Sequence, residues 1–278
     1  MTYEVTSQGI AIPSSRDFDL AQTLDCGQCF RWQVLPGGEY HGIAMGRQLT
    51  ITEQNGIVLF HGVTAAEFEQ VWVPYFDLDF DYAAVRDSFA ALHPVLKQAA
   101  EFAPGIRLLQ QDPWEALCSF IISQNNNIPR IKGIVERLCT LLGEEHDGFC
   151  DFPTPERLAQ QTPDSLAPVR SGFRAKYLIS AAQKVASGEV DLQALFTLPM
   201  DEARRQLMTI YGVGEKVAEC ALLYGLHRLE AFPMDVWMKR AMAVLLPGYT
   251  PEELGEYAGI AQQYLFHYSR CNAQLFTA

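Results

Sequence analysis

The segment that most constrains the fold is LMTIYGVGEKVAECALL, residues 207–223, in which two glycines separate two runs with apolar residues at helical spacing. Gly212 and Gly214 permit a tight turn, because glycine adopts backbone conformations that other residues avoid. The N–H groups of such a turn, followed by the positive end of a helix, can bind phosphate without a basic side chain. The segment predicts a helix-hairpin-helix at about residues 203–223, with Gly212, Val213 and Gly214 as candidate phosphate contacts.

Lys216 is predicted to lie in the first turn of the second helix of this hairpin. The helix dipole disfavours a cation at that position, and a lysine amine that has lost its proton can attack an electrophilic carbon. A solvated surface lysine and a phosphate contact are the other two interpretations. Lys216 is therefore a candidate nucleophile that needs an acidic partner nearby.

Asp235 follows in AFPMDVWMKRAM, immediately before another helical pattern. One interpretation is a helix N-cap, a position that favours aspartate. A second interpretation adds a fixed negative charge on the same side chain, which would stabilise an oxocarbenium-like transition state at a sugar C1′. The residues alone leave both interpretations open.

A row of asparagines interrupts the apolar run that begins at QDPWEALCSF. Asp112 and Glu115 predict a helix start with a capping box. Residues 125–127 predict the end of that helix, because asparagine amides compete for backbone hydrogen bonds. Pro129 then favours a new helix capped near residues 127–128. The row is either a polar turn or a set of amides presented to nucleobases.

The chain divides near residue 65 into a β-rich part and a longer helical part. Before this point, alternating runs and Gly-bearing turns predict an antiparallel meander at residues 29–35, 40–45, 47–53 and 57–62. After it, helical spacing recurs at residues 65–76, 82–102, 114–142, 174–187, 201–211, 214–226 and 236–246. The order predicts an α+β fold, with an N-terminal antiparallel β domain and flanking helices at 1–105 and a helical body at 106–278.

Charge and composition narrow the classes of function. The 278-residue chain has a formal net charge of −12, which argues against wrapping nucleic acid by bulk electrostatics. Residues 166–188 nevertheless carry four bases and no acid, so they form either a solvated helix face or a local polyanion-binding surface. We expect no secretory signal and no membrane span, because no long apolar run occurs. Seven cysteines, an odd number, do not look like a disulfide framework and favour a reducing cytoplasm.

Several segments, in order across nearly the whole chain, carry a family resemblance: DCGQCFRW (25–32), LLQQDPWEALCSFIISQNNNIPRIKGIVERLC (108–139), SGFRAKY (171–177), GVGEKVAEC (212–220), FPMDVW (232–237) and AQLF (273–276). Together they resemble the helix-hairpin-helix DNA glycosylase superfamily and, more narrowly, the 8-oxoguanine DNA glycosylases. The resemblance implies a two-lobed helical body beside the β domain. It also implies a base-excision-repair glycosylase and AP lyase that flips 8-oxoguanine out of the duplex and excises it opposite cytosine through a lysine Schiff base.

The resemblance implies roles at the damaged base. Lys216 matches the catalytic lysine and Asp235 the catalytic aspartate. Gly27 matches the glycine whose carbonyl accepts the N7–H of 8-oxoguanine, a donor that guanine lacks. The base itself would be contacted by Cys220 and Phe276, which match the pair that sandwiches it, and by Asn272, which stands where a glutamine is usual at its pairing edge.

On the opposite strand, the resemblance implies four contacts. Asn125 matches the asparagine that fills the gap left by the flipped nucleotide, and Phe173 matches an aromatic wedge. Arg130 and Arg174 match the arginines that read the orphaned cytosine. Trp237 departs from the family, in which a histidine that contacts a phosphate is usual at this position beside the aspartate.

The resemblance implies no cofactor and no metal. Cys26 and Cys29 form a CxxC without a second pair, and only Cys271 lies beyond Cys220, whereas related iron–sulfur glycosylases carry four closely spaced cysteines near the C-terminus. We expect a monomer that acts on double-stranded DNA containing 8-oxoguanine in the cytoplasm, at the nucleoid if the source is bacterial. Two alternatives remain: an alkylated-base DNA glycosylase, whose related fold usually lacks the lysine, and a non-catalytic helix-hairpin-helix DNA-binding protein.

Overall fold

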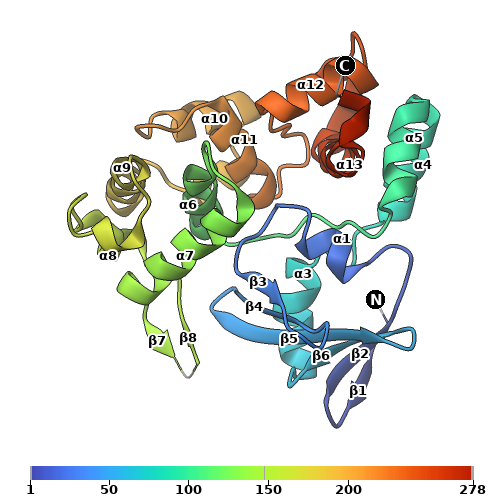
Figure 1. Cartoon of the computed structure of the whole chain (residues 1–278), viewed down its shortest axis with the longest axis horizontal. Coiled ribbons are helices and arrows are strands. Elements are labelled where there is room, and N and C mark those ends of the chain that lie inside the picture. The colour runs from blue at the N-terminus through green and yellow to red at the C-terminus, as the bar shows by residue number, and fades with distance from the viewer. Residues whose placement is uncertain (1, 147, 277–278) are drawn as a thin grey trace.

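The structure, a computed structural model, describes residues 2–146 and 148–276. An antiparallel sheet from the N-terminal part of the chain lies beside a body of helices, which confirms the predicted fold class (Figure 1). No helix in these two ranges is long and apolar enough to cross a membrane.

Six strands form the sheet, and all of its neighbours are antiparallel. Asn55 and Gly56 both have positive φ and close the β5–β6 hairpin, as a two-residue type I′ turn requires. Strands β3 to β6 correspond to the predicted ranges, whereas β1 and β2 extend the sheet beyond them. The order across the sheet is β1 (Glu4–Thr6), β2 (Gly9–Pro13), β6 (Ile57–His61), β5 (Arg47–Gln54), β4 (Tyr40–Ala44) and β3 (Trp32–Val34).

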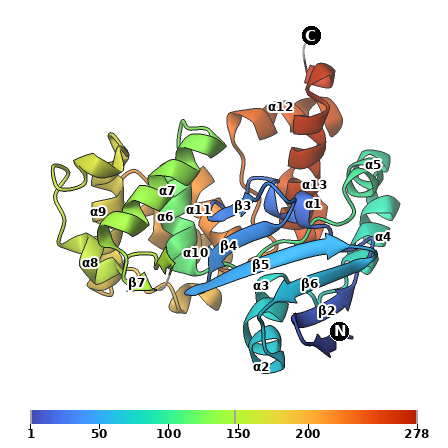
Figure 2. The same ribbon diagram turned by 60° about the horizontal axis from the view of Figure 1, so that its bottom comes forward.

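Short helical segments cover the sheet (Figure 2). They are α1 (Leu20–Leu24), α2 (Ala65–Glu67), the π-helical turn η1 (Phe68–Trp72) and α3 (Val73–Tyr75). The predicted single helix over 65–76 is thus three segments, because Pro74 lacks the N–H that a continuous α-helix needs. Phe60, Phe68, Trp72 and Phe76 are fully buried and form the core between sheet and helices.

The helical body contains the remaining elements, including a second, two-stranded sheet. Pro94 starts a new helix and divides the predicted run 82–102 in two. Helix α13 lies outside every predicted range. The elements are α4 (Tyr82–Leu92), α5 (Pro94–Phe102), α6 (Pro113–Ser123), α7 (Ile128–Leu142), β7 (Glu145–His146), β8 (Phe149–Cys150), α8 (Pro155–Ala159), η2 (Ala167–Val169), α9 (Arg174–Ala186), η3 (Ala194–Phe196), α10 (Met200–Met208), α11 (Glu215–Tyr224), α12 (Val236–Leu245), η4 (Pro251–Tyr257), α13 (Ala258–Cys271) and η5 (Ala273–Phe276).

The body has two lobes that share one hydrophobic core. Figure 1 shows α6 to α10 on one side and α4, α5, α12 and α13 on the other, with α11 packed against α6. Tyr82, Phe89 and Leu96 of α4 and α5 are buried in this core rather than under the sheet. The domain boundary between residues 105 and 106, which groups α4 and α5 with the sheet, remains a prediction.

Candidate active site

The helix-hairpin-helix consists of α10, a turn and α11. Gly212 has a φ of 82°, and a Cβ there would lie 2.3 Å from the Tyr177 ring, so only glycine fits. The N–H of Val213 already donates to Ile210 O at 3.0 Å inside the turn. Gly214 is the N-cap of α11 and provides no side-chain cap, which leaves first-turn N–H groups for an external acceptor.

Lys216 lies half-buried in the first turn of α11. Its Nζ donates to Ser123 Oγ of α6 at 3.2 Å and lies 5.3 Å from the centre of the Phe120 ring. The amine therefore points into the protein, toward the end of α6, rather than freely into solvent.

Asp235 is the N-cap of α12, as predicted, and its Oδ1 accepts from Met238 N–H at 2.7 Å. The cap fixes the direction of the carboxylate through the backbone of the helix. The same side chain lines a cavity that Lys216 also lines. The two interpretations of Asp235 are thus compatible, because one oxygen serves the cap while the group faces the cavity.

This cavity, of about 60 Å³, lies where both lobes meet a loop of the β domain. Four predicted site residues line it together: Gly27, Lys216, Cys220 and Asp235. Burial raises the pKa of the Cys220 thiol to about 11, with the nearby Lys216 amine opposing part of that rise. The thiol is protonated at neutral pH and offers a neutral wall rather than a second nucleophile.

Gly27 has a φ of 90° and sits in the loop between α1 and β3. The fully buried Gln28 holds this loop: its Nε2 donates to Thr23 O and Arg107 O, both at 2.8 Å, and its Oε1 accepts from Leu109 N–H at 3.0 Å. The sequence did not single out Gln28, since its partners Arg107 and Leu109 lie 79 and 81 positions away.

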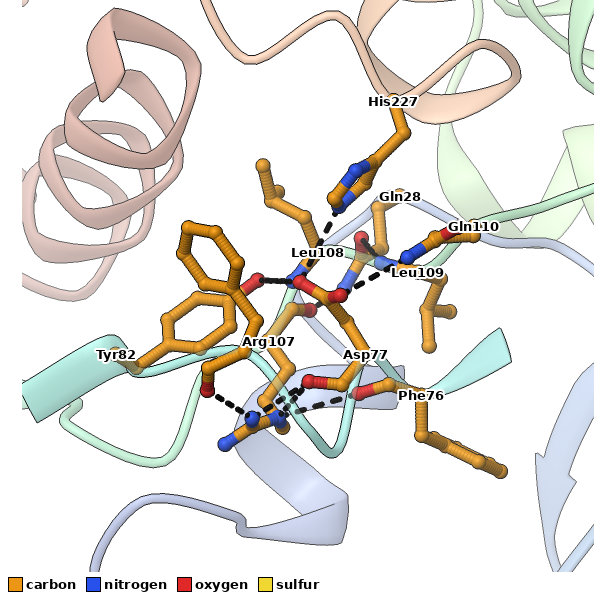
Figure 3. Close-up of polar contacts among 10 residues, drawn as sticks. Gln28, Phe76, Asp77, Tyr82, Arg107, Leu108, Leu109, Gln110 and His227 are labelled. Carbon is orange, nitrogen blue, oxygen red and sulfur yellow. Dashed lines mark hydrogen bonds and ion pairs between the residues drawn. The ribbon is translucent and has the colours of Figure 1, made fainter. Parts of the chain in front are cut away.

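Figure 3 shows that this anchor continues into a buried polar network around Asp77. The Asp77 carboxylate accepts from Tyr82 OH at 3.0 Å and from Gln110 Nε2 at 2.9 Å, and its Oδ2 lies 3.2 Å from His227 Nε2. His227 follows α11, so the network ties the Gly27 loop and the lysine-bearing helix to one framework.

Asn272 and Phe276 are not among the residues that line the cavity, which corrects their predicted place. Asn272 follows α13, where its Nδ2 donates back to Tyr268 O at 2.9 Å. Phe276 packs against Trp237, with ring centres 5.7 Å apart. Both residues lie beyond the end of the helix whose side chains enter the cavity.

Gln262 and Phe266 of α13 line the cavity instead. Residues four apart share one face of a helix, so AQQYLF presents a glutamine and a phenylalanine together. Gln262 Nε2 donates to Pro233 O at 3.3 Å, and a Cβ on Gly27 would lie 3.9 Å from Phe266. The four-residue spacing of Gln262 and Phe266 is the sequence signal that could have identified them as a pair on one helix face.

The asparagine row forms the turn between α6 and α7. Asn125 is exposed and left-handed, with a φ of 48°. Asn126 Nδ2 donates to Ile122 O at 3.0 Å, and Asn127 is the N-cap of α7, which confirms the predicted cap. Asn125 is the member of the row that faces solvent in a strained conformation.

Arg174 lies beneath this turn with its guanidinium buried. Nε donates to Gln124 O at 2.9 Å, Nη2 to Asn125 O at 2.9 Å and Nη1 to Ser171 O at 3.2 Å. Burial, and then the charge of Arg130, lower the pKa of Arg174. The two predicted arginines are therefore neighbours, but Arg130 is exposed whereas Arg174 clamps the turn.

Phe173 stands beside this pair. It is 51% exposed, and the Arg174 guanidinium lies 4.4 Å from the centre of its ring. Phe173, Asn125 and Arg130 thus lie together around Arg174 and are all exposed. Within residues 2–146 and 148–276, no group of three His, Cys, Asp or Glu side chains is arranged to hold a metal.

Residues 10–117 match the 8-oxoguanine DNA glycosylase N-terminal domain, and residues 118–253 match the HhH-GPD superfamily of base excision DNA repair proteins. The chain belongs to the 8-oxoguanine DNA glycosylase family. Relatives named N-glycosylase/DNA lyase in Saccharomyces cerevisiae and N-glycosylase/DNA lyase OGG1 in Arabidopsis thaliana are 33% and 30% identical over 80% and 90% of this chain. The chain spans 66% and 77% of their lengths.

Two solved structures are similar over nearly the whole glycosylase. MBOgg1, in complex with a low-affinity DNA ligand, is 41% identical with a TM-score of 0.91, covering 98% of this chain and 100% of that one. The Clostridium acetobutylicum 8-oxoguanine glycosylase/lyase, bound to DNA with cytosine opposite 8-oxoguanine, is 35% identical with a TM-score of 0.90, covering 98% and 99%. As a member of this family, the chain is a DNA N-glycosylase with AP lyase activity.

Proposed function

We propose that this glycosylase excises 8-oxoguanine opposite cytosine from double-stranded DNA through a Schiff base on Lys216. The observation that carries the proposal is the shared cavity, in which an amine, a carboxylate and a backbone loop at Gly27 converge. An amine and a fixed negative charge are the two groups that displacement of a base at C1′ needs.

Base recognition rests on the Gly27 loop. Its carbonyl would accept the N7–H of 8-oxoguanine, whereas guanine presents an acceptor there and is rejected. Cys220 and Phe266 would enclose the base from two sides, and Gln262 would face its pairing edge. Gln262 and Phe266 thereby take the roles first assigned to Asn272 and Phe276.

The chemistry proceeds in two steps. The lone pair of the Lys216 amine attacks C1′ as the bond to the base breaks with its electron pair leaving on the base, and the base takes up the proton that the amine loses. Asp235 stabilises the positive charge that develops on the sugar. The bond to Lys216 then becomes an imine as the sugar ring opens. Loss of a C2′ proton from this imine expels the 3′ phosphate by β-elimination.

The surface around the cavity would hold the duplex. The turn at Gly212 and Gly214 and the first turn of α11 would bind phosphate, although the Val213 N–H is occupied within the turn. Asn125 would fill the gap left by the flipped nucleotide, and Phe173 would wedge the neighbouring step.

Arg130 and Arg174 would read the orphaned cytosine. Arginine supplies only donors, and cytosine offers two neighbouring acceptors at its pairing edge. Arg130 is exposed and free to turn toward the base, whereas Arg174 would exchange one of its carbonyl partners for it. We further propose a monomer that acts in the cytoplasm, at the nucleoid in a bacterial cell.

Single-turnover excision tests the proposal. Duplexes carry 8-oxoguanine opposite each of the four bases, and a matched duplex carries 3-methyladenine. We expect the fastest excision opposite cytosine and a covalent complex after borohydride reduction. Excision of 3-methyladenine alone, without a trapped complex, would support the alkylated-base alternative, and no excision at all would support the non-catalytic one.

A further inference from the structure

Glu219 is a buried carboxylate in the lysine-bearing helix. It lies on α11, three positions after Lys216 and next to Cys220, and is 5% exposed. A buried carboxylate is costly unless its oxygens are hydrogen-bonded. Both oxygens of Glu219 are bonded: Oε1 accepts from Arg204 Nε at 2.6 Å, and Oε2 accepts from Phe232 N–H at 2.7 Å.

These two bonds connect three parts of the site. Arg204 belongs to α10, the first helix of the hairpin, and Phe232 lies three positions before Asp235. Pro233, whose φ is fixed by its ring, follows Phe232 and accepts from Gln262 through its carbonyl. The short segment from Phe232 to Asp235 is thus anchored on one side by α11 and on the other by α13.

We propose that Glu219 is a positioning residue that sets the Asp235 carboxylate against the Lys216 amine. Lys216 and Glu219 share one helix, so the bond from Glu219 to the Phe232 N–H fixes the aspartate segment relative to the nucleophile. Arg204 neutralises the carboxylate, which keeps Asp235 as the acting negative charge in the cavity. This inference rests on the proposed function of Lys216 and Asp235.

The test is a double-mutant cycle on the single-turnover excision rate. Glu219→Gln keeps the shape but meets two donors with one acceptor oxygen, so one of the two bonds is lost. We expect excision to slow about 10- to 100-fold, as for a misplacement of about 1 Å at a reacting centre. In an Asp235→Asn background, the same change is expected to cost less than about threefold, because both act through one group.

A second readout separates positioning from general loss of structure. Borohydride trapping on a preformed abasic duplex needs Lys216 but not base release, so Glu219→Gln should slow trapping less than about threefold. Rates are expressed per active enzyme by titration with that duplex. Asp201→Asn is the control. It removes the charge of the second carboxylate that pairs with Arg204, and because the Asp201 side chain is 86% exposed, excision should stay within about twofold of wild type.

Glu219→Asp covers the case in which Glu219→Gln does not fold. It keeps the charge for Arg204 but is one methylene shorter, so it cannot reach both donors, and we expect excision about tenfold slower. A wild-type rate in either variant, an additive loss with Asp235→Asn, or an equal loss of trapping and excision would overturn the proposal. If wild type excises only another damaged base, the proposed substrate fails, and the same cycle is run on that base.

Discussion

The residues proposed to act on the sugar and those proposed to read the opposite base are held in different ways. Lys216 and Asp235 occupy the first turn and the N-cap of two helices and line one cavity. Arg174 is buried under the turn that carries Asn125, and Arg130 is exposed. We therefore expect the proposed catalytic pair to be preorganised before DNA binds and the proposed opposite-base reader to rearrange when DNA binds.

The largest effect is expected at the nucleophile. Lys216→Gln should slow base release by at least about 10³-fold and abolish borohydride trapping, because an amide cannot form the imine. Affinity for the damaged duplex should remain within a fewfold of wild type, since the hairpin is unchanged. Titration of a fluorescent duplex checks binding. A covalent adduct in this variant would show that Lys216 is not the nucleophile and that Lys216 and Asp235 are not the catalytic pair.

Removing the charge of Asp235 is expected to have the next largest effect. Asp235→Asn keeps an oxygen to accept from Met238 N–H, so the cap and the fold should survive. Excision should fall about 10²- to 10³-fold, because the developing positive charge loses its partner. Thermal unfolding provides the control. Wild-type excision by a folded Asp235→Asn variant would reduce the residue to a helix cap.

Alanine variants of the two arginines should differ in how fast they excise 8-oxoguanine opposite each of the four bases. Arg174→Ala removes the donor to the carbonyls of residues 124 and 125, so it should lower the melting temperature. It should also slow excision opposite all four bases by about 10- to 100-fold, with the largest loss opposite cytosine. Arg130→Ala should leave stability unchanged and lower the preference for cytosine about tenfold.

Salt dependence sharpens this pair of variants. A phosphate-only role predicts equally weakened binding to every duplex and a shallower dependence on salt concentration. Excision opposite the four bases is therefore measured at two salt concentrations. An unchanged opposite-base profile in both variants would contradict the assignment of cytosine reading.

The smallest effects are expected from alanine variants of two residues in the C-terminal region, Gln262 and Asn272. Gln262→Ala removes a side chain from the cavity wall and should slow excision of 8-oxoguanine about tenfold. Asn272→Ala removes a side chain that bonds back to its own helix, and excision should change less than about twofold. The reverse order would restore the original assignment of Asn272.

The features that the sequence predicts well are helix ends. Asp112, Asn127 and Asp235 each cap a helix where a cap was predicted, because capping depends on residues within three positions. The Asp112 capping box is only half formed, since the Glu115 carboxylate lies 3.5 Å from Arg31 of the β domain. A contact that spans 84 positions has no local signal.

Helix α13 is an element that the sequence analysis did not predict. Residues 258–265 are all buried, including Gln262 and Gln263, so this part of the helix has no solvent-exposed polar face. Because no helix was predicted here from the sequence, the C-terminal contacts were assigned to Asn272 and to Phe276 in AQLF. Gln262 and Phe266, in AQQYLF, fit these roles better because they line the cavity. Buried polar partners such as those of Glu219 are likewise set by tertiary packing, not by local pattern.

The most direct test of the account is to identify the residue that carries the DNA. Wild-type enzyme is reduced with borohydride during turnover of a duplex with 8-oxoguanine opposite cytosine, the complex is digested with protease, and the peptides are analysed by mass spectrometry. The account predicts a sugar adduct on the peptide that contains Lys216 and on no other lysine. An adduct on another amine, such as Lys132 or Lys239, or excision with no adduct, would contradict it.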